Sequence, residues 1–143
     1  MFFVRRFKED DIYDVFRIAS ESLTERYSLE LLMDIYHSWP DGFLVAVSSD
    51  IIGFIAGSKY EKSARILMLA VDKNHRERGV GSALLNRFMM QCRAENISSI
   101  TLEVRVNNRK AIEFYANRGF QIISMLDNYY TNGDSAYIMW KIL

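Results

Sequence analysis

The chain has 143 residues, half of them hydrophobic and 13% aromatic, with 18 basic and 18 acidic residues. This length is typical of one domain with a substantial core, so we expect a single domain over residues 1–143. A formal net charge of zero argues against a nucleic-acid-binding protein, which usually carries a clear basic excess. No apolar run approaches the roughly 20 residues of a membrane-spanning helix. We therefore expect neither nucleic acid nor membrane among its partners.

Cysteine and histidine are scarce. Cys92 is the single cysteine, which excludes an intrachain disulfide, and its place on an apolar helical stripe favours a core residue over a nucleophile. His37 and His75 form no metal-binding pattern with it, so no metal is expected. Residues 1–6 are too short and wrongly charged for a signal peptide, which makes the cytoplasm the expected location.

The first 60 residues predict a strand, two helices and a hairpin. Residues 2–7 suit a strand, and Asp10 is placed to cap an amphipathic helix. Ser28 is placed to cap a second helix that ends before Pro40. The hairpin strands cover residues 43–47 and 51–60.

The rest of the chain alternates strands and helices. Residues 64–71 show so little polar alternation that we expect a strand buried on both faces. A helix follows to about Glu95, then a strand at 100–106 and a helix at 109–118. Two strands at 120–126 and 136–142 form a final hairpin. In the strand, Glu103 falls on the face opposite the aliphatic row, because side chains alternate with a period of two. Asn108 can cap the second of these helices.

A glycine-containing loop lies between the strand at 64–71 and the helix that follows it. Its sequence is Arg76-Glu77-Arg78-Gly79-Val80-Gly81-Ser82. The first amides of a helix have no partner within the helix, and the helix dipole adds about half a positive charge there. A strand, a glycine turn and a helix start therefore favour an anion site, and a pyrophosphate suits it.

Other interpretations of this loop fit less well. A P-loop requires Gly-Lys-Ser/Thr, but Ser82-Ala83 follows Gly81. A dinucleotide-binding fingerprint requires glycine or alanine where Leu84 stands. A helix start without any ligand remains open from the loop alone.

Four blocks together resemble the GNAT (Gcn5-related) acetyltransferases, nearest to the RimI-like and Ard1-like protein N-terminal α-acetyltransferases. The blocks are Arg76-x-x-Gly79-x-Gly81, Leu102 to Asn108 with Ala111 to Phe120, Asn128-Tyr129-Tyr130, and Leu23-Thr24-Glu25-Arg26-Tyr27, similar to a Leu-Pro-Glu-x-Tyr loop. The resemblance implies an α/β fold with a central, mixed, mostly antiparallel sheet flanked by helices. It also implies that the sheet splays beside the strand that precedes the glycine loop.

The resemblance assigns acetyl-CoA binding to two stretches. Backbone groups of Leu69, Ala70 and Val71 would pair with the pantetheine arm, and the loop amides from Arg76 to Ser82 would hold the pyrophosphate. The candidates are Leu69, Ala70, Val71, Arg76, Glu77, Arg78, Gly79, Val80, Gly81, Ser82, Asn108 and Tyr115. Lys73 and Arg109 are further candidates for phosphate contacts.

Two residues are predicted to be catalytic. Glu103 would serve as general base, directly or through water, and Tyr115 would protonate the departing thiolate. The alternatives are an outward glutamate paired with a lysine or arginine on a neighbouring strand, and a core tyrosine. An α-amine has a pKa near 8 and a lysine near 10.4, so a single carboxylate suffices for the former.

Peptide selection is assigned to Glu25, Tyr27, Tyr129 and Tyr130. Thr24 replaces the proline of the related loop and leaves the first-residue preference open. The sequence thus predicts transfer of acetyl from acetyl-CoA to the free N-termini of proteins, with ribosomal proteins among the candidate substrates. The amine would attack the thioester directly in a ternary complex. An acetyltransferase of small amines and a non-catalytic coenzyme-binding module are the alternatives. The oligomeric state and any auxiliary subunit stay open.

Overall fold

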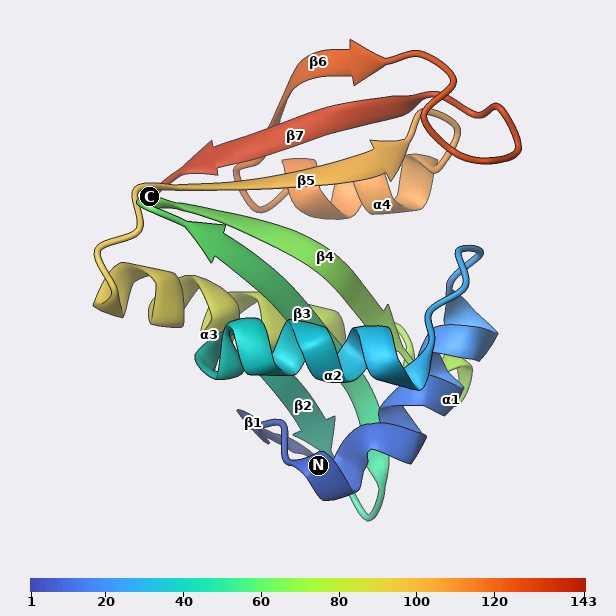
Figure 1. Ribbon diagram of the computed structural model, residues 1–143, viewed down its shortest axis with the longest axis vertical. Helices are drawn as coiled ribbons and strands as arrows, with labels where there is room; N and C mark the ends of the chain where they lie inside the picture. The colour runs from blue at the N-terminus through green and yellow to red at the C-terminus, as the bar shows by residue number, and fades with distance from the viewer.

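All residues from Met1 to Leu143 are described by a computed structural model. The elements are β1 (Phe3–Arg6), α1 (Ile12–Ser22), α2 (Leu29–Ser38), β2 (Phe43–Val47), β3 (Ile51–Tyr60), β4 (Ser63–Val71), α3 (Val80–Ala94), β5 (Ser99–Arg105), α4 (Arg109–Ala116), β6 (Gln121–Leu126) and β7 (Ala136–Ile142). The strands form one sheet in the order β1-β2-β3-β4-β5-β7-β6, shown in Figure 1. Only β4 and β5 run parallel, so the mixed, mostly antiparallel sheet confirms the predicted fold class.

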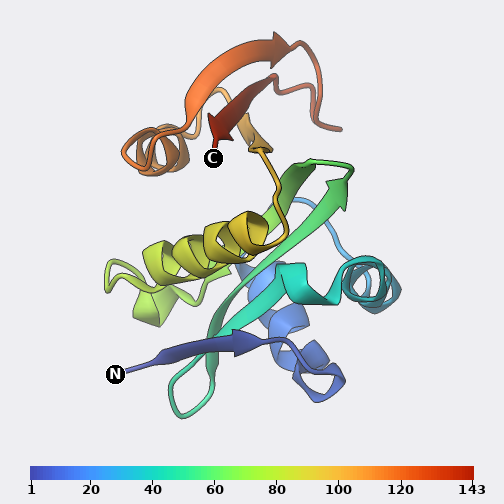
Figure 2. The same cartoon turned by 90° about the vertical axis from the view of Figure 1, so that its left-hand side faces the viewer.

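Helices cover both faces of the sheet. Figure 2 shows α3 and α4 on one side and α1 and α2 on the other. The larger core cluster contains Phe88 of α3 and Tyr115 of α4, and the smaller one contains Val15 of α1 and Leu32 of α2. Each amphipathic helix thus buries its apolar stripe against the sheet.

Most of the predicted elements are confirmed, and one cap is wrong. β2, β3 and β7 have the predicted bounds, and Ser28 accepts a hydrogen bond from the Leu31 amide at 3.0 Å as the cap of α2. Asp10 does not cap α1, which begins at Ile12 after a short 3₁₀ turn. The buried neighbour Asp11 instead pairs with Arg5, whose Nη1 lies 2.8 Å from its Oδ2. A tertiary ion pair therefore replaces the predicted local cap.

β4 packs against the cores on both faces of the sheet, as the sequence predicted, but neither face is buried along the whole strand. Its burial alternates, and Leu67 and Leu69 are only half-buried. Met68 pairs with Ala56 but Ile66 pairs with Gly57, so Leu67 is the extra residue of a β-bulge. Because the bulge shifts the alternation by one residue, Ile66 packs into the core beneath α3 and Met68 into the core beneath α1 and α2.

β4 and β5 separate just before this bulge. They pair only from Ser63↔Ser99 to Arg65↔Thr101, and Figure 1 shows them meeting at one end and diverging toward the other. Beyond Arg65, the edge of β4 that faces β5 is left without a strand partner. This separation is the splay that the family resemblance implied.

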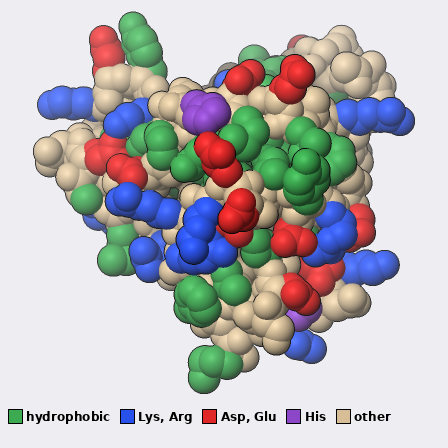
Figure 3. Space-filling view, turned by 60° about the horizontal axis from the view of Figure 1, so that its bottom comes forward, with side chains coloured by type: hydrophobic (Ala, Val, Ile, Leu, Met, Phe, Trp, Pro, Cys, Tyr) green, Lys and Arg blue, Asp and Glu red, His purple; other side chains and the backbone are tan.

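The surface carries mixed charges. On the face shown in Figure 3, basic and acidic side chains are interspersed around a group of hydrophobic ones, as a zero net charge leads one to expect. The helices are each too short or too polar to cross a membrane.

Candidate active site

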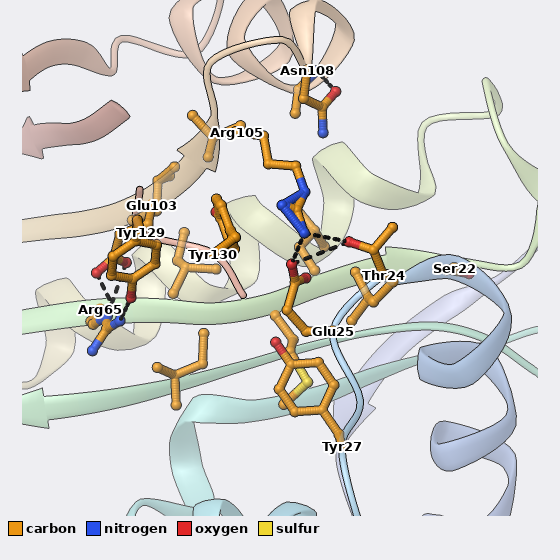
Figure 4. A pocket seen from close by; sticks show the side chains of 18 of the residues that line it. Ser22, Thr24, Glu25, Tyr27, Arg65, Glu103, Arg105, Asn108, Tyr129 and Tyr130 are labelled. Carbon is orange, nitrogen blue, oxygen red and sulfur yellow. Dashed lines mark hydrogen bonds and ion pairs between the residues drawn. The ribbon is translucent and has the colours of Figure 1, made fainter. Parts of the chain in front are cut away.

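A cleft of about 960 Å³ opens where β4 and β5 part. It is lined by β4, β5, α4, and the loops between α1 and α2 and between β6 and β7. Eight of the predicted site residues lie on it: Glu25, Tyr27, Leu69, Glu103, Asn108, Tyr115, Tyr129 and Tyr130. The cleft therefore collects residues from positions 25 to 130 around the separated strands, as Figure 4 shows for its labelled side chains.

The β4 edge and α4 form one side of the cleft. Leu69 and Tyr115 line it, and Asn108 caps α4 by accepting a hydrogen bond from the Ala111 amide at 3.2 Å. Ala70 does not present its side chain to the cleft, because that methyl group is buried in the core under α1 and α2. Any role of Ala70 in binding is thus limited to its backbone.

The glycine loop (residues 76–82) is not among the residues that line the cleft; it follows β4 and leads into α3. Gly79 takes φ +82° and Glu77 φ +63°, so the chain turns through two left-handed residues before the helix starts at Val80. No amide from Arg76 to Ser82 donates to a backbone acceptor. Free amides in a turn that opens a helix are able to bind an anion, which is the arrangement that the predicted pyrophosphate site requires.

Two arginines near the loop are arranged differently from the prediction. Arg76 turns away from the loop, donating through Nε to the Val71 carbonyl at 3.0 Å and through Nη2 to Ser22 Oγ at 3.3 Å. Arg118, which the sequence did not indicate, donates through Nε to Ser82 Oγ at 3.0 Å. Arg118 also stacks on the Phe114 ring at 3.8 Å, and thus brings a positive charge to the start of α3.

Glu103 is held by an arginine from the neighbouring strand. Arg65 Nε donates to Glu103 Oε2 at 3.0 Å, and Arg65 Nη2 lies 2.7 Å from Glu103 Oε1. Arg65 Nη2 also donates to the Tyr129 hydroxyl at 3.2 Å (Figure 4). The pairing of Glu103 with a neighbouring strand, expected above as an alternative, is present, and it lies on the wall of the cleft.

Tyr115 is the most buried hydroxyl-bearing residue of the site, 8% exposed, and packs edge-on against Phe114 and Phe120. Burial raises the pKa of its phenol above the usual value near 10. The phenol is therefore protonated at neutral pH, and it can donate a hydrogen bond.

The other side of the cleft is built from side chains of two loops around Arg105. Arg105 Nη2 donates to Thr24 Oγ1 at 3.1 Å and to Glu25, and its guanidinium stacks on the Tyr130 ring at 3.8 Å. Burial, with the nearby Glu25 carboxylate, raises the pKa of Tyr130 to about 12. Tyr27 is shifted in the same direction, because its burial and Glu25 both raise its pKa.

Sequence reasoning missed Arg65 and Arg105 as site residues. Arg105 shares the period-two row of Glu103, so the alternation contained a signal for it. Arg65 carried no such signal, because its contact with Glu103 depends on where the strands separate.

Comparison with known proteins places this site in a family. Residues 10–120 match the model of the acetyltransferase (GNAT) family. Ard1 from Thermoplasma volcanium has a crystal structure similar to this chain, with TM-score 0.96 and 47% identity over 99% of this chain and 97% of that one. Naa20 from Chaetomium thermophilum, in complex with a bisubstrate analogue, gives TM-score 0.89 and 28% identity over 99% and 86% of the two chains.

A curated relative extends the comparison. Human N-alpha-acetyltransferase 30 is 30% identical over 140 residues, which cover 94% of this chain and 39% of the human protein. This chain thus spans about two-fifths of the length of that relative.

The chain belongs to the GNAT acetyltransferase family. It is an acetyl-CoA-dependent N-acetyltransferase, so the predicted family and enzyme class are confirmed. The free amides of the glycine loop, the nearby Arg118 and the unpartnered edge of β4 fit a ligand with a pyrophosphate and an amide-containing arm.

Proposed function

We propose that this enzyme acetylates the α-amino group of protein N-termini at the cleft between β4 and β5. One observation carries the proposal. The cleft that reaches the β4 edge and Tyr115 is also lined by Tyr27, Tyr129 and Tyr130, which belong to the α1–α2 and β6–β7 loops at its other side. Human N-alpha-acetyltransferase 30 and the archaeal relatives named N-alpha-acetyltransferase support the same activity.

The acetyl donor side would use backbone groups. Acetyl-CoA supplies the acetyl group as a thioester. The loop amides from Arg76 to Ser82 would hold its pyrophosphate, with Arg118 beside them, and the free edge of β4 at Leu69 and Val71 would pair with its pantetheine arm. For Val71 this requires its carbonyl to exchange Arg76 for the ligand.

The amine substrate must lose a proton. At pH 7 the neutral form costs about 1 kcal/mol for an α-amine and about 4–5 kcal/mol for a lysine, at roughly 1.4 kcal/mol per pKa unit. Glu103 would accept this proton through a water, because a carboxylate has lone pairs beyond those that Arg65 occupies. One weakly basic carboxylate is sufficient for an α-amine and poorly matched to a lysine.

The departing sulfur must be stabilised. As the new carbon–nitrogen bond forms and the carbon–sulfur bond breaks, Tyr115 would donate a hydrogen bond to the sulfur. Its pKa is raised, whereas a thiol has a pKa near 8.5, so complete loss of its proton is unfavourable. Tyr115 therefore acts mainly as a hydrogen-bond donor, a narrower role than the sequence suggested.

The identity of the N-termini that are acetylated is also part of this proposal. The proposal covers both ribosomal proteins and a broader set of N-termini. The reaction would take place in the cytoplasm, where new N-termini meet acetyl-CoA, with residues 1–143 acting as one domain.

The test is release of coenzyme A from acetyl-CoA over a panel of amines. The panel contains peptides that start with Ser, Ala, Met and Glu, an N-blocked peptide with an internal lysine, and spermidine. Turnover confined to the free N-termini is the expected result. Turnover of spermidine or the internal lysine alone would overturn the substrate assignment and leave the enzyme class intact.

A further inference from the structure

The loop between α1 and α2 has almost no backbone support. Its flanks are fixed, because the Leu23 amide donates to the Ala19 carbonyl and Ser28 caps α2. From Thr24 to Tyr27, however, no backbone group hydrogen-bonds to another backbone group. The position of this segment therefore depends on side chains.

Three side chains join the loop to β5. Arg105 Nη2 donates to Thr24 Oγ1 at 3.1 Å and to Glu25 Oε1, and Thr24 Oγ1 donates to Glu25 Oε1 at 3.1 Å. Figure 4 shows these contacts closing a triangle at the wall of the cleft. Charge-assisted hydrogen bonds are stronger than neutral ones, and the Arg105 side chain is only 17% exposed.

Arg105 also reaches the opposite loop. Its guanidinium stacks on Tyr130, and Nη1, which has no hydrogen-bond partner, lies 3.6 Å from Asp134 Oδ2. A single arginine on β5 thus contacts both loops that carry the tyrosines of the cleft.

We propose that Thr24 and Arg105 are positioning residues that hold the peptide-facing loops of the cleft. Thr24 stands where the related Leu-Pro-Glu-x-Tyr loop has proline, which restricts the backbone by its ring. A threonine hydroxyl can accept from Arg105 and donate to Glu25 at once, which proline cannot do. We call Thr24, Glu25 and Arg105 the Thr24 clasp. In this chain the hydrogen bonds of the clasp hold the loop, where the related loop is restrained by the proline ring. The effect of the clasp on peptides rests on the proposed function.

Two substitutions test the role of the Thr24 hydroxyl. Thr24→Val removes the hydroxyl and keeps the branched shape, whereas Thr24→Ser keeps the hydroxyl. Limited trypsin digestion reads the loop directly, because Arg26 lies exposed within it. Thr24→Val is expected to be cut after Arg26 roughly five- to tenfold faster than the wild type, and Thr24→Ser at about the wild-type rate. Thr24→Pro is expected to be cut about as slowly as the wild type, because the proline ring restrains the backbone in place of the side-chain hydrogen bonds.

The kinetic readout separates positioning from general damage. Thr24→Val is expected to raise the peptide KM roughly fivefold, with little change in the acetyl-CoA KM or the melting temperature. Thr24→Val combined with Arg105→Met should be cut no faster than Arg105→Met alone, since the two residues act through one another.

The digestion decides the inference whatever the substrate is. Equal cutting of Thr24→Val and Thr24→Ser would overturn the clasp. A difference in cutting with no turnover of any free N-terminus would support the clasp and overturn the proposed function.

Discussion

The side of the cleft formed by β4, the glycine loop and α4 differs in kind from the side formed by the α1–α2 and β6–β7 loops. The first side presents backbone: a strand edge free beyond Arg65 and the amides of residues 76–82. The second presents side chains, with Arg105 joining Glu25 to Tyr130. A conserved chemical group such as a pyrophosphate suits fixed amides, while variable peptides suit side chains that can differ between relatives.

Glu103 and Arg65 stand at the junction of the two sides. Their pairing crosses the point where the β4–β5 ladder ends, and Arg65 also reaches Tyr129. The comparison predicts three separable kinetic effects: changes at the junction alter kcat, those on the backbone side alter the acetyl-CoA KM, and those on the side-chain side alter the peptide KM.

The largest effect is expected at the junction. Glu103→Gln removes the proposed proton acceptor and should lower kcat about 10²- to 10⁴-fold, with the binding of coenzyme A unchanged. Glu113→Gln makes the same change on the exposed surface of α4 and serves as the matched control. Full activity of Glu103→Gln in steady-state assays would exclude Glu103 as the base.

A smaller effect tests the backbone side. A side chain at Gly81 would meet Phe114 at an ordinary 3.5 Å, so Gly81→Asp is sterically tolerated but adds a negative charge to the anion site. The acetyl-CoA KM should rise roughly 10- to 100-fold, with the peptide KM little changed. Asn86→Asp adds the same charge at an exposed position of α3 and should leave both constants near wild type.

The side-chain side is tested by Tyr129→Phe. The hydroxyl of Tyr129 accepts a hydrogen bond from Arg65, which leaves its own proton for a substrate carbonyl. The peptide KM should rise about three- to tenfold and the acetyl-CoA KM should stay constant. Tyr60→Phe, at an exposed tyrosine of β3, is the control; an acetyl-CoA KM that rises in parallel would contradict the division of the cleft.

The weakest effect concerns alkaline stability. Tyr130 has its pKa raised to about 12, above the value near 10 of an unfolded tyrosine. The folded state therefore holds this proton more tightly, so the stabilisation is complete below pH 10 and is lost as the pH rises through 12. Absorbance of tyrosinate should show late ionisations, because the pKa values of Tyr27 and Tyr115 are raised as well, and Tyr130→Phe should remove one of them. The stability of that variant should fall less between pH 10 and 12. An unchanged titration curve would place the late step elsewhere.

The two sides also differ in how well sequence alone predicted them. The glycine loop, the Asn108 cap and the hairpin strands follow from local rules, because left-handed turns, helix starts and period-two alternation depend on neighbouring residues. The predicted Asp10 cap of α1 was wrong because the neighbouring Asp11 pairs with Arg5, six residues earlier on a strand, and the helix begins only after it. The sequence predicted that β4 packs on both faces but not the bulge at Leu67, which moves its row of buried side chains from one face to the other.

By itself, the sequence determined the order of the elements, the glycine turn before α3 and the family signature, since each depends on residues close together along the chain. Only the tertiary structure decided the length of the β4–β5 ladder, the Arg65–Glu103 pair and the contacts of Arg105 with two loops. These contacts join residues that are 25 to 81 positions apart. Their existence depends on where the sheet opens, which no local pattern specifies.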